Sequence, residues 1–350
     1  MTVTFGARTP ADVRRVLLVG NGLIERDRSA DGLFRPVGEG IWQLALRVPV
    51  DHRGSYQVAF DTDATPGPLP ELVSRAGADP LNAARIPLRW TAGEASVLEL
   101  PDAPPSRWRP VSPDTPRGTV TTLRWAGSPA VSARDVHVYR SAGTREATGV
   151  VVLSDGDMWF GRIDLAGQLD AMVAAGEIPP ITVVAPSAVD IDTRWRDLTA
   201  QDAYADFLAA ETRSFATESG PVSTEPRDWT IAGQSLGGLT ALHTAVRHQE
   251  VFGGVLAQSP SLWWRPGSEY RVRLDTQGMW LLDHLLSASA DQRFRIDVGR
   301  SEGRMVDLAR TAAAALAGRG ADVTLTEYSG GHDHACWRIH LLDGIKELHS

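Results

Sequence analysis

The sequence predicts an α/β chain in which an N-terminal antiparallel β-sandwich precedes a domain built on a mostly parallel sheet. Up to about residue 126, short apolar runs alternate with turns rich in Pro, Gly and Asp, as in β-sandwiches. After about residue 130, strand-like runs alternate with longer helical patterns, which is the rhythm of a parallel sheet covered by helices on both faces. The chain has 350 residues, enough for two hydrophobic cores, so we expect one domain at 1–126 and a second at 127–350.

In the N-terminal half, the expected strands are the apolar runs 13–20, 41–49, 56–63 and 96–100. Two stretches that contain proline, 64–87 and 101–118, are predicted as connections outside the core.

In the C-terminal half, strands are expected at 134–140, 149–156, 180–187, 228–233, 253–259, 294–299 and 322–328. Helices are expected at 162–175, 200–216, 236–247 and 304–317. The last helix places its apolar residues on one face, at the spacing of an amphipathic helix: Met305, Leu308, Ala309, Ala312 and Leu316.

Composition excludes several classes of function. The net charge of −8 argues against a nucleic-acid partner, which requires a dominant basic face, although a local group of arginines can still bind a small anion. The sequence contains no run of about 18 apolar residues, which a membrane span would require, so we expect a soluble protein with no membrane partner. The N-terminus lacks the features of a secretory signal, and we expect a cytoplasmic location. The single cysteine, Cys336, excludes an internal disulfide and a cysteine-built zinc site.

The stretch GQSLGG, which contains Ser235, predicts a nucleophile. GxSxG is a weak motif alone, but here a short apolar strand precedes it and a helix with Leu236 and Leu239 on one face follows. The sharp turn of such an elbow leaves no room for a Cβ at Gly233 or Gly237. The sequence therefore predicts an exposed Ser235 hydroxyl on a strained backbone.

A serine nucleophile needs a base, and a base needs an acid that fixes its tautomer. His332 follows the last predicted strand in SGGHDHACW; we favour it over His334, two residues further on. Glu302, in the loop after the strand 294–299, is the expected acid. Asp297, within that strand, and Asp307, within the next helix, are weaker candidates.

The order Ser235, Glu302, His332 is that of an α/β-hydrolase, which is the fold predicted for the second domain. The oxyanion hole of such an enzyme uses two backbone N–H groups. We expect one from Leu236 and the other from Asp157 or Met158, after the strand 149–153. Asp155 and Asp157 could instead form a metal pair, but no further ligand lies beside them in sequence, and we predict no metal site and no cofactor.

These motifs also resemble a known family, the enterochelin (ferric enterobactin) esterases, over nearly the whole chain. The matching stretches occur in order: DPLN, LSDGDMW, AGEIPP, DIDTRWRDL, GQSLGGLTAL, FGGVLAQSPSLWW, VGRSEGRM and GGHDHACWR. The resemblance implies a β-sandwich cap domain and an esterase domain, and it places Ser235, His332 and Glu302 on the family's catalytic positions. Some members of the family are described as using a serine–histidine dyad, so whether Glu302 is essential stays open.

The resemblance implies a substrate of the enterobactin type, a cyclic triester of serine with three catecholamides, and iron enters only as part of that substrate. Anionic, aromatic ligands require cationic donors and aromatic walls. The candidate substrate-binding residues are Arg194, Trp159, Trp263, Trp264 and Arg265. The tryptophans could instead be core residues, and Arg265, like Arg196, could be a solvated surface group. The SAVDID segment before Arg194 departs from the family pattern, so the identity of the siderophore stays open.

Two other functions stay open. A feruloyl or carbohydrate-ester hydrolase would share the fold and a phenolic acyl group, but such enzymes are usually exported. A catalytically silent siderophore-binding protein would show a damaged triad, whereas all three positions are intact here.

Overall fold

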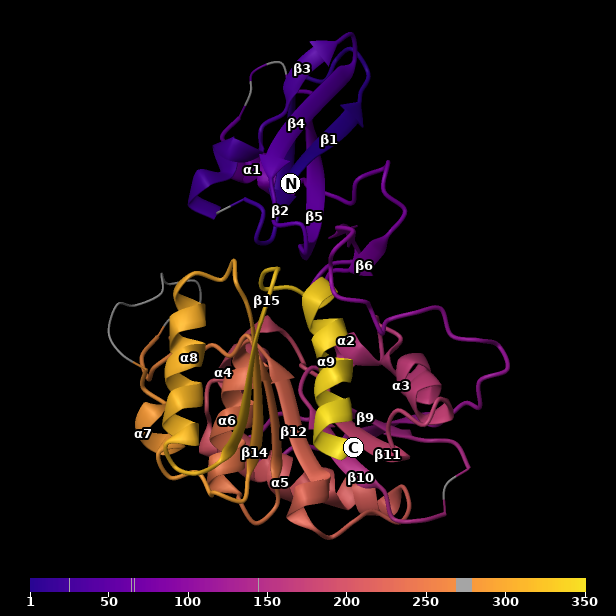
Figure 1. Cartoon of the computed structure of the whole chain (residues 1–350), viewed down its shortest axis with the longest axis vertical. Helices are drawn as coiled ribbons and strands as arrows, with labels where there is room; N and C mark the ends of the chain where they lie inside the picture. The colour runs from indigo at the N-terminus through magenta and orange to yellow at the C-terminus, as the bar shows by residue number, and fades with distance from the viewer. Residues whose placement is uncertain (25, 64, 66, 144, 269–278) are drawn as a thin grey trace. The chain divides into compact units, whose positions relative to one another are not determined.

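The computed structural model divides into two compact units (Figure 1). It describes residues 1–24, 26–63, 65, 67–143, 145–268 and 279–350. The first unit contains residues 1–105 together with two short segments from late in the chain, Gly299–Glu302 and Tyr328–Cys336. The second unit contains the remainder: Ser106–Val298, Gly303–Glu327 and Trp337–Ser350.

The first unit is an antiparallel β-sandwich, as predicted. One sheet has the order β1 (Thr2–Arg8), β4 (Ile41–Arg47), β3 (Arg35–Gly38). The other has the order β2 (Arg15–Gly20), β5 (Arg53–Asp61), β7 (Glu94–Glu99), β6 (Arg85–Pro87). Buried side chains of both sheets share one core, in which the rings of Phe5 and Tyr56 meet edge to face at 5.2 Å.

The stretch 64–87 contributes more to this unit than a connection would. It contains α1 (Leu69–Ser74) and strand β6, and a short 3₁₀ helix, η1 (Arg26–Gly32), lies earlier in the chain. The side chain of Leu72 is completely buried against Leu17 and Ala59. The prediction that this stretch lies outside the core is therefore wrong, because α1 packs Leu72 and the partly buried Leu69 and Val73 against the sheet.

The second unit contains an eight-stranded sheet, with the order β15-β14-β13-β12-β10-β11-β9-β8. Its strands are β8 (Thr119–Trp125), β9 (Arg134–Arg140), β10 (Gly149–Leu153), β11 (Ile181–Pro186), β12 (Trp229–Gln234), β13 (Gly254–Gln258), β14 (Arg293–Gly299) and β15 (Asp322–Tyr328). The strands from β10 to β14 pair in parallel, whereas β9 and β8 are antiparallel. The mostly parallel sheet predicted from the sequence is thus confirmed.

The first unit ends earlier than the sequence predicts. Strand β8 pairs along its whole length with β9, so it belongs to the sheet of the second unit. The predicted domain boundary after residue 126 is therefore corrected to Pro105.

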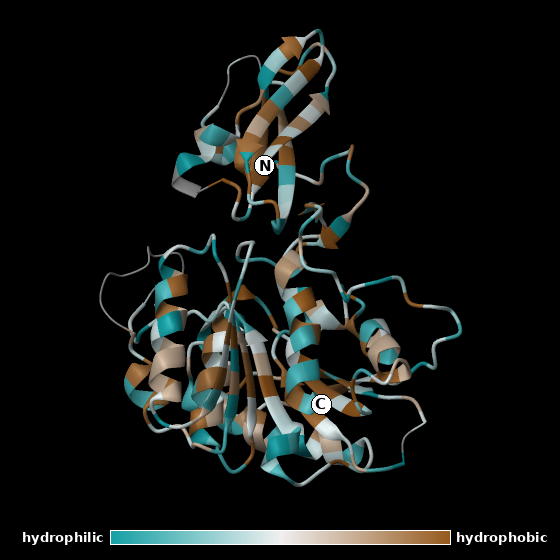
Figure 2. Cartoon of the chain, in the orientation of Figure 1, coloured by the Kyte–Doolittle hydropathy of each residue, from teal (hydrophilic) through white to brown (hydrophobic). Residues whose placement is uncertain are grey.

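Helices cover both faces of the eight-stranded sheet. They are α2 (Gly156–Trp159), α3 (Leu165–Ala174), α4 (Ile191–Asp197), α5 (Asp202–Glu218), η2 (Pro226–Asp228), α6 (Leu236–Arg247), α7 (Leu282–Leu285), α8 (Arg304–Ala317) and α9 (His334–His349). Because side chains alternate along a strand, Val150 and Val152 pack with α5, α6 and α8, while Val151 and Leu153 pack with α2, α3 and α9. In Figure 2, hydrophobic residues lie along strands of the eight-stranded sheet, and α8 carries both hydrophobic and hydrophilic residues. Within the described ranges, every helix is too short or too polar to span a membrane.

Candidate active site

Ser235 stands at a sharp turn between β12 and α6, with φ 60° and ψ −118°. A Cβ added at Gly233 would overlap the carbonyl group of Gly237, and one added at Gly237 would lie 3.0 Å from the Cβ of Ser154. These are the strand, strained turn and helix of a nucleophile elbow. Ser235 is a partly exposed residue, in a strained conformation as the sequence predicts.

The elbow is braced by the end of β13, which sequence reasoning did not identify. The backbone N–H of Ser235 donates to the carbonyl of Gln258 at 2.9 Å, and that of Ser261 donates to the carbonyl of Ser235 at 3.0 Å. The hydroxyls of Ser235 and Ser261 lie 3.3 Å apart. The signal in the sequence was AQSPS, a run of polar residues that directly follows a buried strand. These bonds hold the strained turn in place.

In the first compact unit, the structure brings the predicted acid and histidine together. Glu302 Oε2 lies 2.6 Å from His332 Nδ1. The backbone N–H of Gly299 donates to the other carboxylate oxygen at 2.6 Å, and the Glu302 side chain is only 2% exposed. A carboxylate at Nδ1 selects the tautomer with its proton on that nitrogen, which leaves Nε2 as the basic position.

The competing candidates have other environments. His334 is the first residue of α9. Asp297 is fully buried, which raises its pKa, and it accepts hydrogen bonds from Arg295 and Gln258. Asp307 is exposed on α8, beside Arg310.

The loop after β10 is tightly constrained where the second oxyanion donor is expected. Asp155 adopts a left-handed conformation (φ 68°), and a Cβ on Gly156 would overlap the carbonyl group of Ala185. The N–H of Met158 donates to the carbonyl of Asp155 at 2.9 Å, so Met158 is corrected from oxyanion donor to helix residue. Asp157 remains the predicted donor, together with Leu236, the first residue of α6, where helical N–H groups lack helical partners.

Arg194, on α4, has an internal partner. Its Nε and Nη2 donate to the two carboxylate oxygens of Asp155 at 2.9 and 2.8 Å. Burial lowers the pKa of Arg194, but the adjacent Asp155 carboxylate outweighs it, so the pKa is raised. Arg194 therefore fixes the loop that carries Asp155, while its role in anion binding stays a prediction. Asp155 is also one of the two residues of the alternative metal site, and both of its carboxylate oxygens bond to Arg194.

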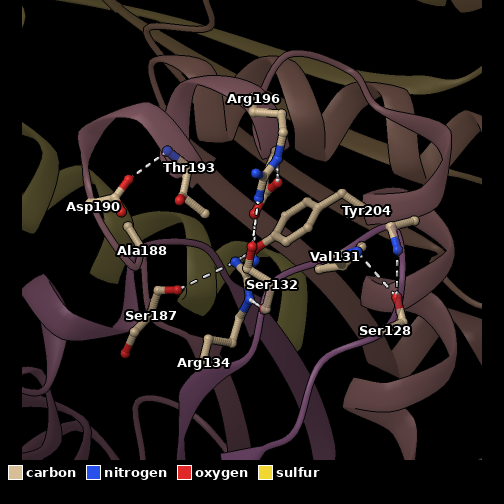
Figure 3. A network of polar contacts seen from close by, with 12 residues as sticks. Ser128, Val131, Ser132, Arg134, Ser187, Ala188, Asp190, Thr193, Arg196 and Tyr204 are labelled. Carbon is tan, nitrogen blue, oxygen red and sulfur yellow. Dashed lines mark hydrogen bonds and ion pairs between the residues drawn. The ribbon is translucent and has the colours of Figure 1, made fainter.

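The segment that carries Arg194 is itself held in place (Figure 3). The carboxylate of Asp190 accepts from the N–H of Thr193 at 2.7 Å, which caps α4. Arg134, buried beneath the segment, pairs with Asp197 at the end of α4 and donates to the hydroxyl of Tyr204 at 3.2 Å. Arg194 is therefore mounted on a rigid support.

Two of the three predicted aromatic contacts are core residues. Trp159 is completely buried, and its Nε1 donates to Gln234 at 3.1 Å. Trp264 is 6% exposed and meets Trp280 edge to face. Both are corrected to packing residues. Trp263 and Arg265 are partly exposed and stay predicted substrate-binding residues.

Comparison with known proteins identifies the family of the chain. A family described as putative esterase matches residues 132–348, and one described as the N-terminal part of enterochelin esterase matches residues 2–109. The chain is 31% identical to the iron(III) salmochelin esterase of Escherichia coli O6:H1, over 98% of this chain and 86% of that protein. It is 28% identical to the iron(III) enterobactin esterase of Dickeya dadantii, over 96% and 83%.

A solved structure gives the same result for the fold. The enterobactin esterase of Shigella flexneri, crystallised in the presence of enterobactin, superposes with a TM-score of 0.85 at 25% identity, covering 99% of this chain and 92% of that one. The chain is therefore a carboxylic ester hydrolase and belongs to the enterochelin esterase family.

Proposed function

We propose that this esterase hydrolyses the ester backbone of a catecholate siderophore of the enterobactin type, in its ferric or iron-free form, and so releases iron in the cytoplasm. The observation that carries the reaction type is the nucleophile elbow at Ser235. The substrate class rests on the relatives, which are named esterases of iron(III) salmochelin and iron(III) enterobactin. The match of the N-terminal part to that of enterochelin esterases favours this substrate class over feruloyl or carbohydrate esters.

In the proposed mechanism, Ser235 attacks an ester carbonyl of the trilactone while His332 Nε2 takes the hydroxyl proton. Glu302, whose Oε2 lies 2.6 Å from His332 Nδ1, stabilises the imidazolium that forms on His332. The N–H groups of Leu236 and Asp157 stabilise the negative charge on the carbonyl oxygen. Collapse of the tetrahedral intermediate breaks the ester bond, and His332 returns the proton to the leaving serine hydroxyl of the substrate.

Water then attacks the acyl group on Ser235, with His332 again acting as base, and the linearised product leaves. A linear siderophore loses the closed ring that holds its three catecholates in place, so it holds iron more weakly. We assign Trp263 and Arg265 to contact with the aromatic, anionic catecholates, for which an indole face and a guanidinium are suited.

Chromatography of products tests the proposal directly. The purified protein is incubated with ferric and iron-free enterobactin, beside Ser235→Ala and a control, Ser214→Ala, which changes an exposed serine on α5. Linear trimer, dimer or monomer should appear with the parent and the control and be absent with Ser235→Ala. Turnover of a simple phenolic ester without any product from enterobactin would retain the nucleophile and reject the substrate.

A further inference from the structure

The loop that carries His332 is bonded to the strands of the N-terminal sandwich, within the first compact unit. We infer that Asn21 is a positioning residue for the reaction: its side-chain amide fixes the backbone of His332, and Ser55 fixes the neighbouring Asp333. This inference rests on the proposed role of His332 as the base. It assigns to the N-terminal sandwich a part in turnover.

Asn21 meets the histidine itself. Its Nδ2 donates to the carbonyl oxygen of His332 at 2.6 Å. Asn21 directly follows β2, and its own N–H donates to the carbonyl of Ser55 at 3.1 Å, so its side chain projects from a paired backbone. The two backbones are close enough that a Cβ on Gly331 would lie 3.0 Å from the nitrogen of Gly22.

The residue after the histidine is held by the next strand of the same sheet. Asp333 is 7% exposed, and its Oδ2 accepts from the N–H of Ser55 at 2.8 Å and from the Ser55 hydroxyl at 3.0 Å. Its Oδ1 accepts from the N–H of Ala335 at 2.7 Å, which caps the start of α9. One carboxylate thus ties β5 to the loop and to Ala335.

The loop is also tied on its other side. The N–H of Arg53 donates to the carbonyl of Ser329 at 3.0 Å, and the hydroxyl of Tyr328 donates to the carbonyl of Gly331 at 3.2 Å. The backbone of His332 therefore lies between two anchored segments, and Asn21 bonds the peptide group between them.

These bonds have a catalytic consequence because Glu302 already fixes one edge of the imidazole. The orientation of Nε2 then depends on the peptide to which the ring is attached, and a displacement of about 1 Å at a reacting group can cost about 100-fold in rate. Loss of the Asn21 amide removes this hydrogen bond to the peptide between His332 and Asp333. We expect the effect on kcat, since Asn21 acts through His332.

The experiment compares Asn21→Ala with a matched control, Asn82→Ala, in the full chain. Asn82 lies in the same unit, and its Nδ2 also donates to a backbone carbonyl, that of Val97 at 2.9 Å. The readouts are Tm, kcat and KM for enterobactin, and the rate at which a fluorophosphonate labels Ser235. For Asn21→Ala we expect kcat and the labelling rate to fall about 10- to 100-fold with KM within about threefold. Asn82→Ala should keep the kcat of the parent even if its Tm falls as far as that of Asn21→Ala.

Equal kcat for Asn21→Ala and the parent, or an equal loss in both asparagine variants, overturns the inference. If Asn21→Ala does not fold, Ser55→Ala provides the same comparison, since it removes only the hydroxyl donor to Asp333. Ser235→Ala and His332→Ala are measured alongside. Turnover by either of these defeats the proposed function, whereas their inactivity beside a fully active Asn21→Ala defeats only the inference.

Discussion

At the scale of single residues, both carboxylate oxygens of Glu302 have defined partners. Oε2 faces His332 Nδ1, and Oε1 accepts from the N–H of Gly299. The carboxylate therefore cannot rotate without losing a backbone donor. This geometry favours a role for Glu302 as the acid of a triad.

The substitution Glu302→Gln tests that role. An amide that places its NH₂ group toward Nδ1 selects the opposite imidazole tautomer, which puts the proton on Nε2, where the base must be free. We expect kcat for a simple ester to fall by about 10²- to 10⁴-fold, with KM little changed. Glu327→Gln is the control, because Glu327 pairs with Arg310 on the surface of the second unit. A kcat for Glu302→Gln equal to that of the parent would mean that catalysis uses a serine–histidine dyad and does not need Glu302.

At the scale of elements, the loop after β10 and the helix α4 are joined by the pair of Asp155 and Arg194. The Asp155 side chain is 2% exposed and that of Arg194 is 14% exposed, so each charge depends on the other. Removing one partner from a buried pair costs about 3–5 kcal/mol because the other charge stays buried. The pair fixes the loop that carries Asp157, the predicted second oxyanion donor.

A double-mutant cycle of Asp155→Asn, Arg194→Gln and the double variant measures this coupling. We expect each single change to destabilise the fold, and the double variant to recover about 1–3 kcal/mol relative to the sum of the singles. Kinetics separate this role from anion binding. A positioning role predicts that Arg194→Gln lowers kcat for neutral and anionic esters alike, whereas the predicted role in anion binding would give a specific rise in KM for ferric enterobactin.

The same scale shows what could be predicted from sequence. The helices at 236–247 and 304–317 were located to the residue, because their apolar spacing is regular and the first one starts at the elbow. The helix α9 was missed, although Asp333 caps it and Trp337 and Leu341 follow at helical spacing. The glycines of SGGHDHACW indicate a loop, and the helix starts within the same stretch, at His334.

The side-chain environments could not be predicted. Trp159 follows a functional loop in sequence, but its indole points to Gln234 in the core. Arg194 has its partner 39 residues earlier in the chain. Sequence proximity to a site identifies a loop, whereas the direction of a side chain depends on contacts with distant elements.

At the scale of the whole molecule, we expect a buried histidine to make stability depend on pH. His52 is 1% exposed, and neither ring nitrogen has a hydrogen-bond partner among the residues that the structure describes. Burial lowers its pKa from the ordinary value of 6.5. Below about pH 6.5, His52 therefore binds a proton more readily in the unfolded chain than in the native chain.

Urea unfolding at several pH values tests this linkage. Because the unfolded state binds more protons, the free energy of unfolding should fall as the pH drops below about 6.5, by at most about 1.4 kcal/mol per pH unit from this group. His52→Leu removes the titrating group, so its unfolding free energy should depend less steeply on pH between 5 and 7.5. Parallel pH profiles for variant and parent would show that other groups cause the acid sensitivity.

The discontinuity of the first unit has a consequence for biosynthesis. A nascent chain exposes residues 1–105 long before residues 328–336 are made, yet the Asn21 amide, the backbone N–H of Arg53 and the N–H and hydroxyl of Ser55 have acceptors in that late segment. The sandwich therefore leaves the ribosome with these groups still solvated, and it is completed when the segment Tyr328–Cys336 arrives. Chains that terminate before Tyr328 lack both the base and the segment that completes the sandwich, so competence for catalysis is acquired in a single late step.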